Sequence, residues 1–166
     1  MTDIQFRNAI FPGDETRIRE MIISTGFFYD IEVEVAVELA EEKLRDGDKS
    51  SYQFIFAERE GLSVAYSCFG LIAGTEHSFD LYWIVTHNDF RAKGIGRLLL
   101  EETQRKIGEQ GGRNVIAETS SLEKYQPTRQ FYKQMGYHEA GLIHDYYKEG
   151  DGKVTFVKRI TGSPSW

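Results

Sequence analysis

The sequence predicts an α/β fold, of the α+β kind, in which helices pack on a mixed sheet. Segments with strand character and segments with helical periodicity alternate along the chain, and glycines and prolines stand at the boundaries between them. Of the 166 residues, 40% are hydrophobic, and 11 Phe and 9 Tyr supply enough apolar side chain for a core. We expect a single domain over residues 1–160, followed by a short polar tail over residues 161–166.

The first half of the chain predicts one strand, two helices and three further strands. Residues 4–10 form the expected first strand, and Asp14 can cap a helix that runs to about residue 25. Residues 30–45 alternate like a strand but also share a helical face, and we predict a helix because residues 36–44 are rich in good helix formers. Strands are expected at 52–58, 62–72 and 78–85.

The second half predicts two helices and three strands. A long helix is expected over residues 94–110, because Leu99, Thr103 and Ile107 recur every four residues and Gly111 follows. The later elements are a strand at 115–119, a short helix from Pro127 to Gly136, and a hairpin of residues 137–147 and 154–160.

Composition excludes several classes of function. Twenty Lys and Arg against 26 Asp and Glu give a net charge of −6, which argues against a nucleic-acid binder. Cys68 is the one cysteine, so an internal disulfide and a multi-cysteine metal site are excluded, and we expect no metal. No apolar run is long enough to cross a membrane, and residues 1–5 lack the features of a secretory signal. We therefore expect a cytoplasmic protein that binds no membrane.

The most informative stretch runs from Asp80 to Arg97. A strand ends near Thr86, a polar loop follows, and Gly94 and Gly96 stand where the long helix begins. Such a loop leaves backbone N–H groups unpaired at the positive end of a helix, which suits a phosphate or pyrophosphate, although an ordinary glycine-started helix has the same spacing. A nucleoside-triphosphate P-loop is excluded by the lack of Gly-Lys-Ser/Thr, and Leu99 stands where a dinucleotide fingerprint needs a small residue.

Arg91-Ala92-Lys93-Gly94-Ile95-Gly96 matches the R/Q-x-x-G-x-G/A signature of the GNAT acyltransferase superfamily. The strand at 115–119 and the Phe131-Tyr132 pair before Gly136-Tyr137 follow in the order of that family. The chain from about residue 80 to 137 thus resembles a GNAT domain. The resemblance implies a mixed, mostly antiparallel sheet of about six or seven strands, flanked by about four helices.

The resemblance also implies a cofactor, acetyl-coenzyme A (acetyl-CoA), whose acetyl group is transferred to an amine. The backbone of Ile84, Val85 and Thr86 would pair with the pantetheine arm. The residues whose N–H groups would hold the pyrophosphate are Ala92, Lys93, Gly94, Ile95, Gly96 and Arg97. Arg91 and Lys93 would add charge near the phosphates. Many members carry Asn where this chain has Tyr125, so a contact to coenzyme A from that position is left open.

Two residues are candidates for proton transfer. Tyr132 matches the family tyrosine that protonates the coenzyme A sulfur, and the alternative is a core tyrosine on an amphipathic helix. Asp80 is the candidate base: it lies on a strand eleven residues before Arg91, where some family members place a catalytic glutamate. The alternative is a solvated or salt-bridged carboxylate. Glu118 on a neighbouring strand is the reserve carboxylate.

The acceptor is expected near Phe28 and Tyr29, between the first two helices, unless these aromatics only start an amphipathic helix. The favoured function is N-acetylation of a primary amine of a small molecule. The alternatives are acetylation of a protein lysine or N-terminus, and an acyl-CoA sensor without catalysis. A second copy of the chain is a candidate partner, through the exposed aromatics Tyr146 and Tyr147.

Overall fold

The computed structural model describes residues 3–160, which form seven strands and four α-helices. The strands are hydrogen-bonded in the order β1-β2-β3-β4-β5-β7-β6. Strand β4 runs parallel to β5, whereas the pairs β1–β2, β2–β3, β5–β7 and β6–β7 are antiparallel. The expected α/β fold with a mixed, mostly antiparallel sheet is confirmed, while the expected tail at 161–166 lies outside the described residues.

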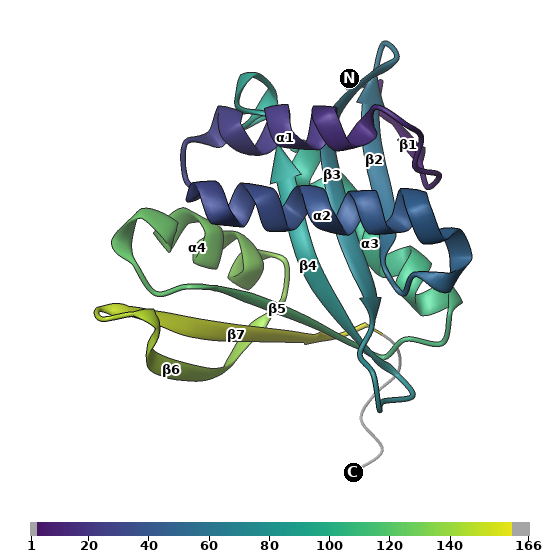
Figure 1. The fold of residues 1–166 in the computed structure, drawn as a ribbon. Helices are drawn as coiled ribbons and strands as arrows, with labels where there is room; N and C mark the ends of the chain where they lie inside the picture. Colours follow the sequence, from purple (N-terminus) through teal and green to yellow (C-terminus); the bar gives the residue numbers. More distant parts are fainter. Residues whose placement is uncertain (1–2, 161–166) are drawn as a thin grey trace. The chain divides into compact units, whose positions relative to one another are not determined.

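By its contacts the described chain divides into two compact units, residues 3–70 with 83–105 and residues 71–82 with 106–160. The elements of the first unit are β1 (Gln5–Arg7), α1 (Asp14–Thr25), α2 (Asp30–Asp46), β2 (Gln53–Arg59), most of β3 (Leu62–Leu71), the end of β4 (Ser78–Thr86) and most of α3 (Ile95–Glu109). Helices α1 and α2 cross the strands β2 and β3 (Figure 1). Residues 30–45, which the sequence leaves between strand and helix, are helical as predicted.

The core of the first unit fills the space between these two helices and the strands. Ile18, Met21 and Ile22 of α1 are fully buried there. From the strands, the rings of Phe54, Phe56 and Tyr66 stack with centroids 6.2–6.4 Å apart. Cys68, fully buried in the same core, is a small packing residue, and burial raises the pKa of its thiol.

The N-terminal segment differs from the sequence prediction in two ways. Strand β1 covers Gln5–Arg7 rather than residues 4–10. Asp14 is the first residue of α1 and not its cap, because Gly13 takes the N-cap position with φ of +103°. The Asp14 carboxylate instead accepts a hydrogen bond from the Phe11 N–H at 2.7 Å, which holds the turn between β1 and α1.

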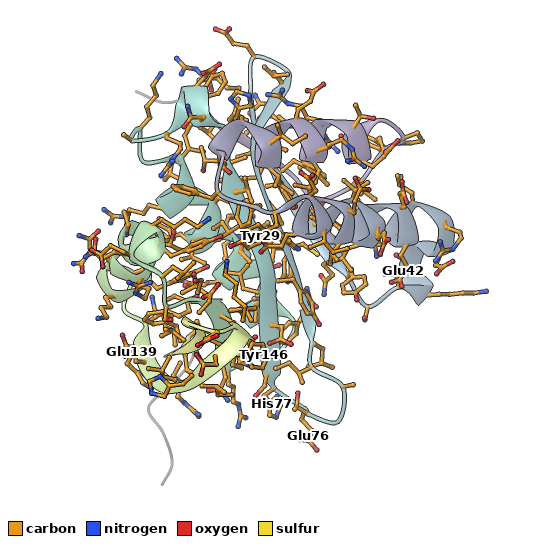
Figure 2. All side chains as sticks on the ribbon, turned by 60° about the vertical axis from the view of Figure 1, so that its left-hand side comes forward. Tyr29, Glu42, Glu76, His77, Glu139 and Tyr146 are labelled. Atoms are coloured by element: carbon orange, nitrogen blue, oxygen red, sulfur yellow. The ribbon has the colours of Figure 1, made fainter. Side chains whose placement is uncertain are left out.

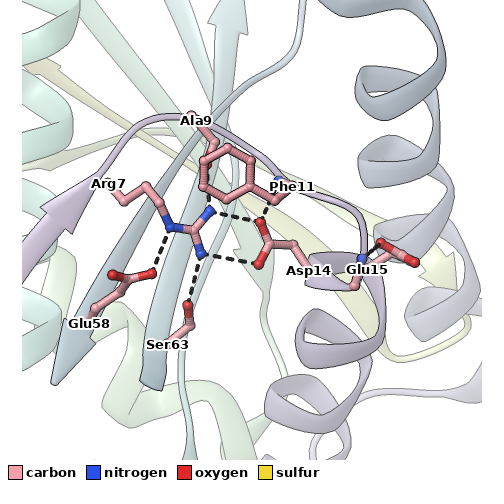
Figure 3. A network of polar contacts seen from close by, with 8 residues as sticks. Arg7, Ala9, Phe11, Asp14, Glu15, Glu58 and Ser63 are labelled. Atoms are coloured by element: carbon pink, nitrogen blue, oxygen red, sulfur yellow. Dashed lines mark hydrogen bonds and ion pairs between the residues drawn. The ribbon is translucent and has the colours of Figure 1, made fainter. Parts of the chain in front are cut away.

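Polar contacts of Arg7 hold the short strand β1 in place (Figure 3). Its guanidinium donates to Glu58 at 2.6 Å and to Asp14 at 2.8 Å, and it lies 4.5 Å from the centroid of the Phe56 ring. The Arg7, Asp14 and Glu58 side chains are only 19%, 12% and 23% exposed. This partly buried ion network joins β1 to β2 and to the start of α1.

The second unit contains the start of β4, then β5 (Asn114–Ser120), α4 (Gln126–Gln134), β6 (His138–Lys148) and β7 (Asp151–Arg159). The final hairpin is longer than predicted: β7 begins at Asp151 rather than 154, and the turn is Glu149-Gly150, with Gly150 at φ of +82°. The parallel ladder between β4 and β5 ends at the pair Leu81–Ala117, so residues 82–86 of β4 extend beyond it. Within residues 3–160, no helix has both the length and the apolar character needed to span a bilayer.

Candidate functional site

The loop that follows β4 is anchored to two elements of the first unit. The His87 N–H donates to the Val64 carbonyl of β3 at 2.8 Å. The Asn88 N–H donates to the Ser24 hydroxyl of α1 at 3.0 Å, a contact that the sequence did not indicate. The His87 ring accepts a hydrogen bond from the Asp89 N–H at 3.1 Å, which gives this histidine a structural role in the loop. The start of α3 is therefore held in a defined position by both neighbours.

The backbone at the start of α3 is shaped for an anion. Ala92 and Gly94 both have positive φ, +61° and +79°. The first helical hydrogen bond runs from the Leu98 N–H to the Gly94 carbonyl at 3.2 Å. Among residues 3–160, the six consecutive N–H groups from Ala92 to Arg97 have no acceptor. Because they lie at the positive end of a 15-residue helix, they fit the pyrophosphate that the sequence predicts here.

Basic side chains surround these N–H groups. The Arg91 guanidinium lies 5.4 Å from the centroid of the Phe27 ring, and the Lys93 ammonium lies 5.7 Å from that of Phe90. In the described part of the chain, neither Arg91 nor Lys93 forms an ion pair, whereas Arg97 pairs with Glu101 at 3.1 Å. Arg91 and Lys93 therefore remain free to pair with an anion.

The predicted acceptor region lies in the same unit. The Phe28 ring contacts Trp83 of β4 edge-on, with centroids 5.1 Å apart. Tyr29 is the N-cap of α2, its N–H donates to Glu32 at 2.9 Å, and its side chain is 45% exposed. Tyr29 thus has a structural role at the start of α2, and part of its ring faces the solvent. The contact of Phe27 with Arg91 places this segment beside the phosphate-binding motif.

Tyr132, the candidate acid, lies in the second unit on α4. Its ring stacks on Phe156 at a centroid distance of 5.5 Å and meets the edge of Tyr137 at 5.4 Å. The side chain is 5% exposed, and burial raises the pKa of its phenol. Within residues 3–160 the hydroxyl has no hydrogen-bond partner. Packing explains the ring, and the protonated, unpartnered hydroxyl is able to donate a hydrogen bond.

Asp80 and Glu118 lie on one face of the sheet in the second unit. Asp80 of β4 is opposite Ile116 of β5, and Glu118 comes two residues later on that strand. Residues two apart on a strand point to the same side, so both carboxylates share this face. Burial raises the pKa of Asp80, Glu118 raises it further, and Lys153 lowers it. Lys153 pairs with Glu118 at 3.6 Å.

Sequence reasoning missed Lys153, and it left the role of Tyr125 open. No local signal marks Lys153, because the same strand also carries Lys158 and Arg159 and the partner of each depends on strand register. Tyr125 is 8% exposed and lies under the Lys124 ammonium at 5.3 Å, so this position presents a packed aromatic ring rather than the family's amide. The described residues hold no cluster of three or more His, Cys, Asp or Glu side chains suited to a metal ion.

Comparison with known proteins places this arrangement in a family. Residues 50–139 match the family model for the acetyltransferase (GNAT) domain. A GNAT-family protein from Desulfovibrio desulfuricans is 36% identical, with a TM-score of 0.93, over 95% of this chain and 99% of that one. No curated protein sequence matches the chain.

Two more distant structures share the fold. An aminoglycoside 6'-N-acetyltransferase complexed with coenzyme A is 14% identical, with a TM-score of 0.73, over 96% of this chain and 99% of that one. The ribosomal-protein-S18-alanine N-acetyltransferase of Escherichia coli is 14% identical, with a TM-score of 0.74, over 98% of this chain and 97% of that one. With the family model, the 36% identical relative and the N–H groups at the start of α3 in agreement, the chain belongs to the GNAT acetyltransferase family, whose members are acyltransferases that use acetyl-CoA.

Proposed function

We propose that this protein transfers an acetyl group from acetyl-CoA to a primary amine of a small molecule. The observation that carries the proposal is the run of six N–H groups from Ala92 to Arg97, at the start of α3, that have no acceptor in the described part of the chain. They suit a pyrophosphate, and Arg91 and Lys93 supply the two free positive charges beside them. When bound, acetyl-CoA supplies the thioester that the amine attacks.

The end of β4 offers backbone hydrogen-bonding groups to which the pantetheine arm is proposed to bind. Residues 82–86 extend past the parallel ladder with β5, which ends at Leu81. The groups of Ile84, Val85 and Thr86 on that side of the strand are thus not used by this ladder. In the proposal they hold the arm as a further strand would, by backbone hydrogen bonds.

Asp80 is proposed as the base that removes a proton from the acceptor. An amine with a pKa near 10.4 is neutral in about one molecule in 10³ at pH 7, a cost of about 4–5 kcal/mol. Burial raises the pKa of Asp80, which makes it a stronger base than a fully solvated carboxylate. Tyr132 holds its proton and delivers it to the sulfur of the leaving thiolate.

The acceptor proposed here is a cationic small molecule in the cytoplasm. In the first unit, Phe28 and the partly exposed ring of Tyr29 offer aromatic faces, and in the second unit Glu118 offers a carboxylate. Groups of either kind attract an ammonium group. The net charge of −6 adds a general attraction for cations. A protein that shares the fold is an aminoglycoside 6'-N-acetyltransferase, which supports a small-molecule acceptor.

Thiol release from acetyl-CoA tests the proposal against a panel of acceptors: small amines, aminoglycosides, and peptides with a free N-terminus or lysine. We expect release with a small amine, and about a 10²–10⁴-fold loss of kcat in Asp80→Asn and in Tyr132→Phe. Tyr137→Phe is the matched control, because it removes the neighbouring buried phenol. Release with peptides alone would favour a protein substrate, and acetyl-CoA binding without release to any acceptor would favour a sensor.

A further inference from the structure

We propose that Lys153 is a positioning residue for Asp80: it holds the Glu118 carboxylate in place and puts a positive charge on the face of the sheet from which Asp80 projects. The effect of Lys153 on catalysis rests on the proposed function, in which Asp80 removes the proton from the acceptor. The placement of the three charged residues does not, because Asp80, Glu118 and Lys153 all belong to the second unit.

Strand register brings the three charges to one side of the sheet. Asp80 is opposite Ile116 in the parallel pair of β4 and β5. In the antiparallel pair of β5 and β7, Glu118 is opposite Thr155 and Ser120 is opposite Lys153. Because side chains alternate along each strand, Asp80, Glu118 and Lys153 project from the same face as Ile116.

Lys153 is enclosed, while its acidic partner reaches the solvent. Its side chain is 14% exposed against 44% for Glu118, and the two charged groups are 3.6 Å apart. The ammonium also lies 4.1 Å from the centroid of the Tyr146 ring of β6. An ammonium held between a carboxylate and an aromatic face has few other positions to occupy, so its charge is fixed beside Glu118.

The irregular part of β6 places the Tyr146 ring on Lys153. The register of β6 and β7 shifts between Ile143 and Lys148, and Asp145 has φ of +54°. The Asp145 carboxylate accepts a hydrogen bond from the Gly150 N–H at 2.8 Å, which holds this bulge closed. Tyr146 follows directly, on the final hairpin (Figure 2). A bulge of this kind redirects a side chain, and here the redirected ring covers the ammonium.

Within residues 3–160, the charged groups that act on Asp80 are Glu118 and Lys153. Glu118 projects from β5 and Lys153 from β7, Tyr82 is two residues along β4 itself, and Tyr146 of β6 contacts Lys153. Strand β3, next to β4 in the sheet, has no charged residue and contributes only the buried Tyr66 and Cys68 as ionisable groups. Glu118 raises the pKa of Asp80 and Lys153 lowers it, so the two act with opposite sign. Lys153 thus offsets the repulsion that Glu118 would otherwise exert.

The test is a carboxyl ¹³C NMR titration of Asp80 in the full chain, with Asp80→Asn to assign the signal. Lys153→Met removes the charge at similar length, and we expect the pKa of Asp80 to rise by about half a pH unit or more. Lys153→Arg restores the charge and should restore the titration. Glu118→Gln should move the pKa of Asp80 downward, and Lys148→Met, a lysine of the same hairpin, should leave it in place.

An Asp80 titration that is unchanged or shifted downward in folded Lys153→Met would overturn the proposal, as would an equal upward shift in Lys148→Met. Circular dichroism at each pH establishes that the variants remain folded. The pH dependence of kcat then tests the proposed function separately. If Asp80 is the base, the acidic limb of that profile moves upward with the NMR titration in Lys153→Met. A limb that stays in place while the titration moves would reject Asp80 as the base and leave the role of Lys153 intact.

Discussion

Replacing Gly94 with alanine has two effects that can be measured separately: a loss of stability without ligand, and a loss of affinity for acetyl-CoA. Gly94 has φ of +79°, and a Cβ built there has no heavy atom within 4 Å. The alanine side chain therefore causes no clash within the protein, and the cost is the left-handed backbone, about 1 kcal/mol. For a chain of 166 residues this lowers the Tm by about 2–4 °C without any ligand.

The effect on acetyl-CoA binding is measured by the increase in Tm that the cofactor produces. At 100 times its Kd, a ligand stabilises the folded state by about 2.7 kcal/mol, which raises the Tm of the unchanged protein by about 5–11 °C. The added methyl group would lie beside the free N–H groups, where the pyrophosphate is proposed to bind. We therefore expect the Kd for acetyl-CoA to be at least tenfold weaker. At the same cofactor concentration the stabilisation then falls to about 1.4 kcal/mol, so the increase in Tm is halved.

Gly74 provides the matched control. It has φ of +84°, again with no atom within 4 Å of a built Cβ, but it lies in the turn between β3 and β4. Gly74→Ala should lose as much intrinsic stability as Gly94→Ala and keep the full increase in Tm with acetyl-CoA. NAD and ATP serve as ligand controls and should produce no increase. An equal increase with acetyl-CoA in both variants would refute the assignment of the pyrophosphate to the start of α3.

Three further predictions concern the stability of the fold. Arg7→Met leaves the Asp14 and Glu58 carboxylates, 12% and 23% exposed, without their cation, and should lower the free energy of unfolding in urea by about 2 kcal/mol. Thr103→Val removes the buried hydroxyl that lies 2.8 Å from the Ser67 hydroxyl, and should cost about 1–3 kcal/mol, part of which Ser67→Ala restores in the double variant. Asp80→Asn should stabilise the protein at pH 7. Because burial raises the pKa of Asp80 in the folded state, its ionisation opposes folding above that pKa, and the gain should vanish at about pH 3, where the carboxyl is protonated in both states.

Local patterns were sufficient for most of the fold and for the free N–H groups at the start of α3, whose binding of a pyrophosphate stays a prediction. Helix formation over Asp30–Asp46 could be predicted because residues 36–44 favour a helix strongly enough to decide between two periodicities. The start of α3 could be predicted because the N–H groups left free at a helix start are a local property of the backbone. For the same reason the motif residues from Arg91 to Gly96 were identified as one group from the sequence alone.

Features that depend on pairing between distant residues could not be predicted. The Asp14 carboxylate lies seven residues after Arg7, and the third member of their network, Glu58, lies 51 residues after Arg7. Sequence reasoning therefore gave Asp14 the role of a helix cap, the commonest local use of an aspartate before a helix. Lys153 was missed for the same reason, because its place beside Glu118 depends on the register of β5 and β7 and on the bulge at Asp145.

Several candidate functional positions, at the start of α3 and at Asp80 and Tyr132, are held in states that cost free energy without a ligand. Ala92 has a left-handed backbone, which costs an alanine about 1–2 kcal/mol, and the six N–H groups from Ala92 to Arg97 have no acceptor among residues 3–160. Asp80 carries its charge in a half-buried position on the same sheet face as a second carboxylate, and the Tyr132 hydroxyl has no hydrogen-bond partner within residues 3–160. Structural residues such as Arg7 and Thr103 have their polar groups paired instead. In the proposed function these costs serve cofactor binding and proton transfer, and the stabilising effect expected for Asp80→Asn follows from the same proposal.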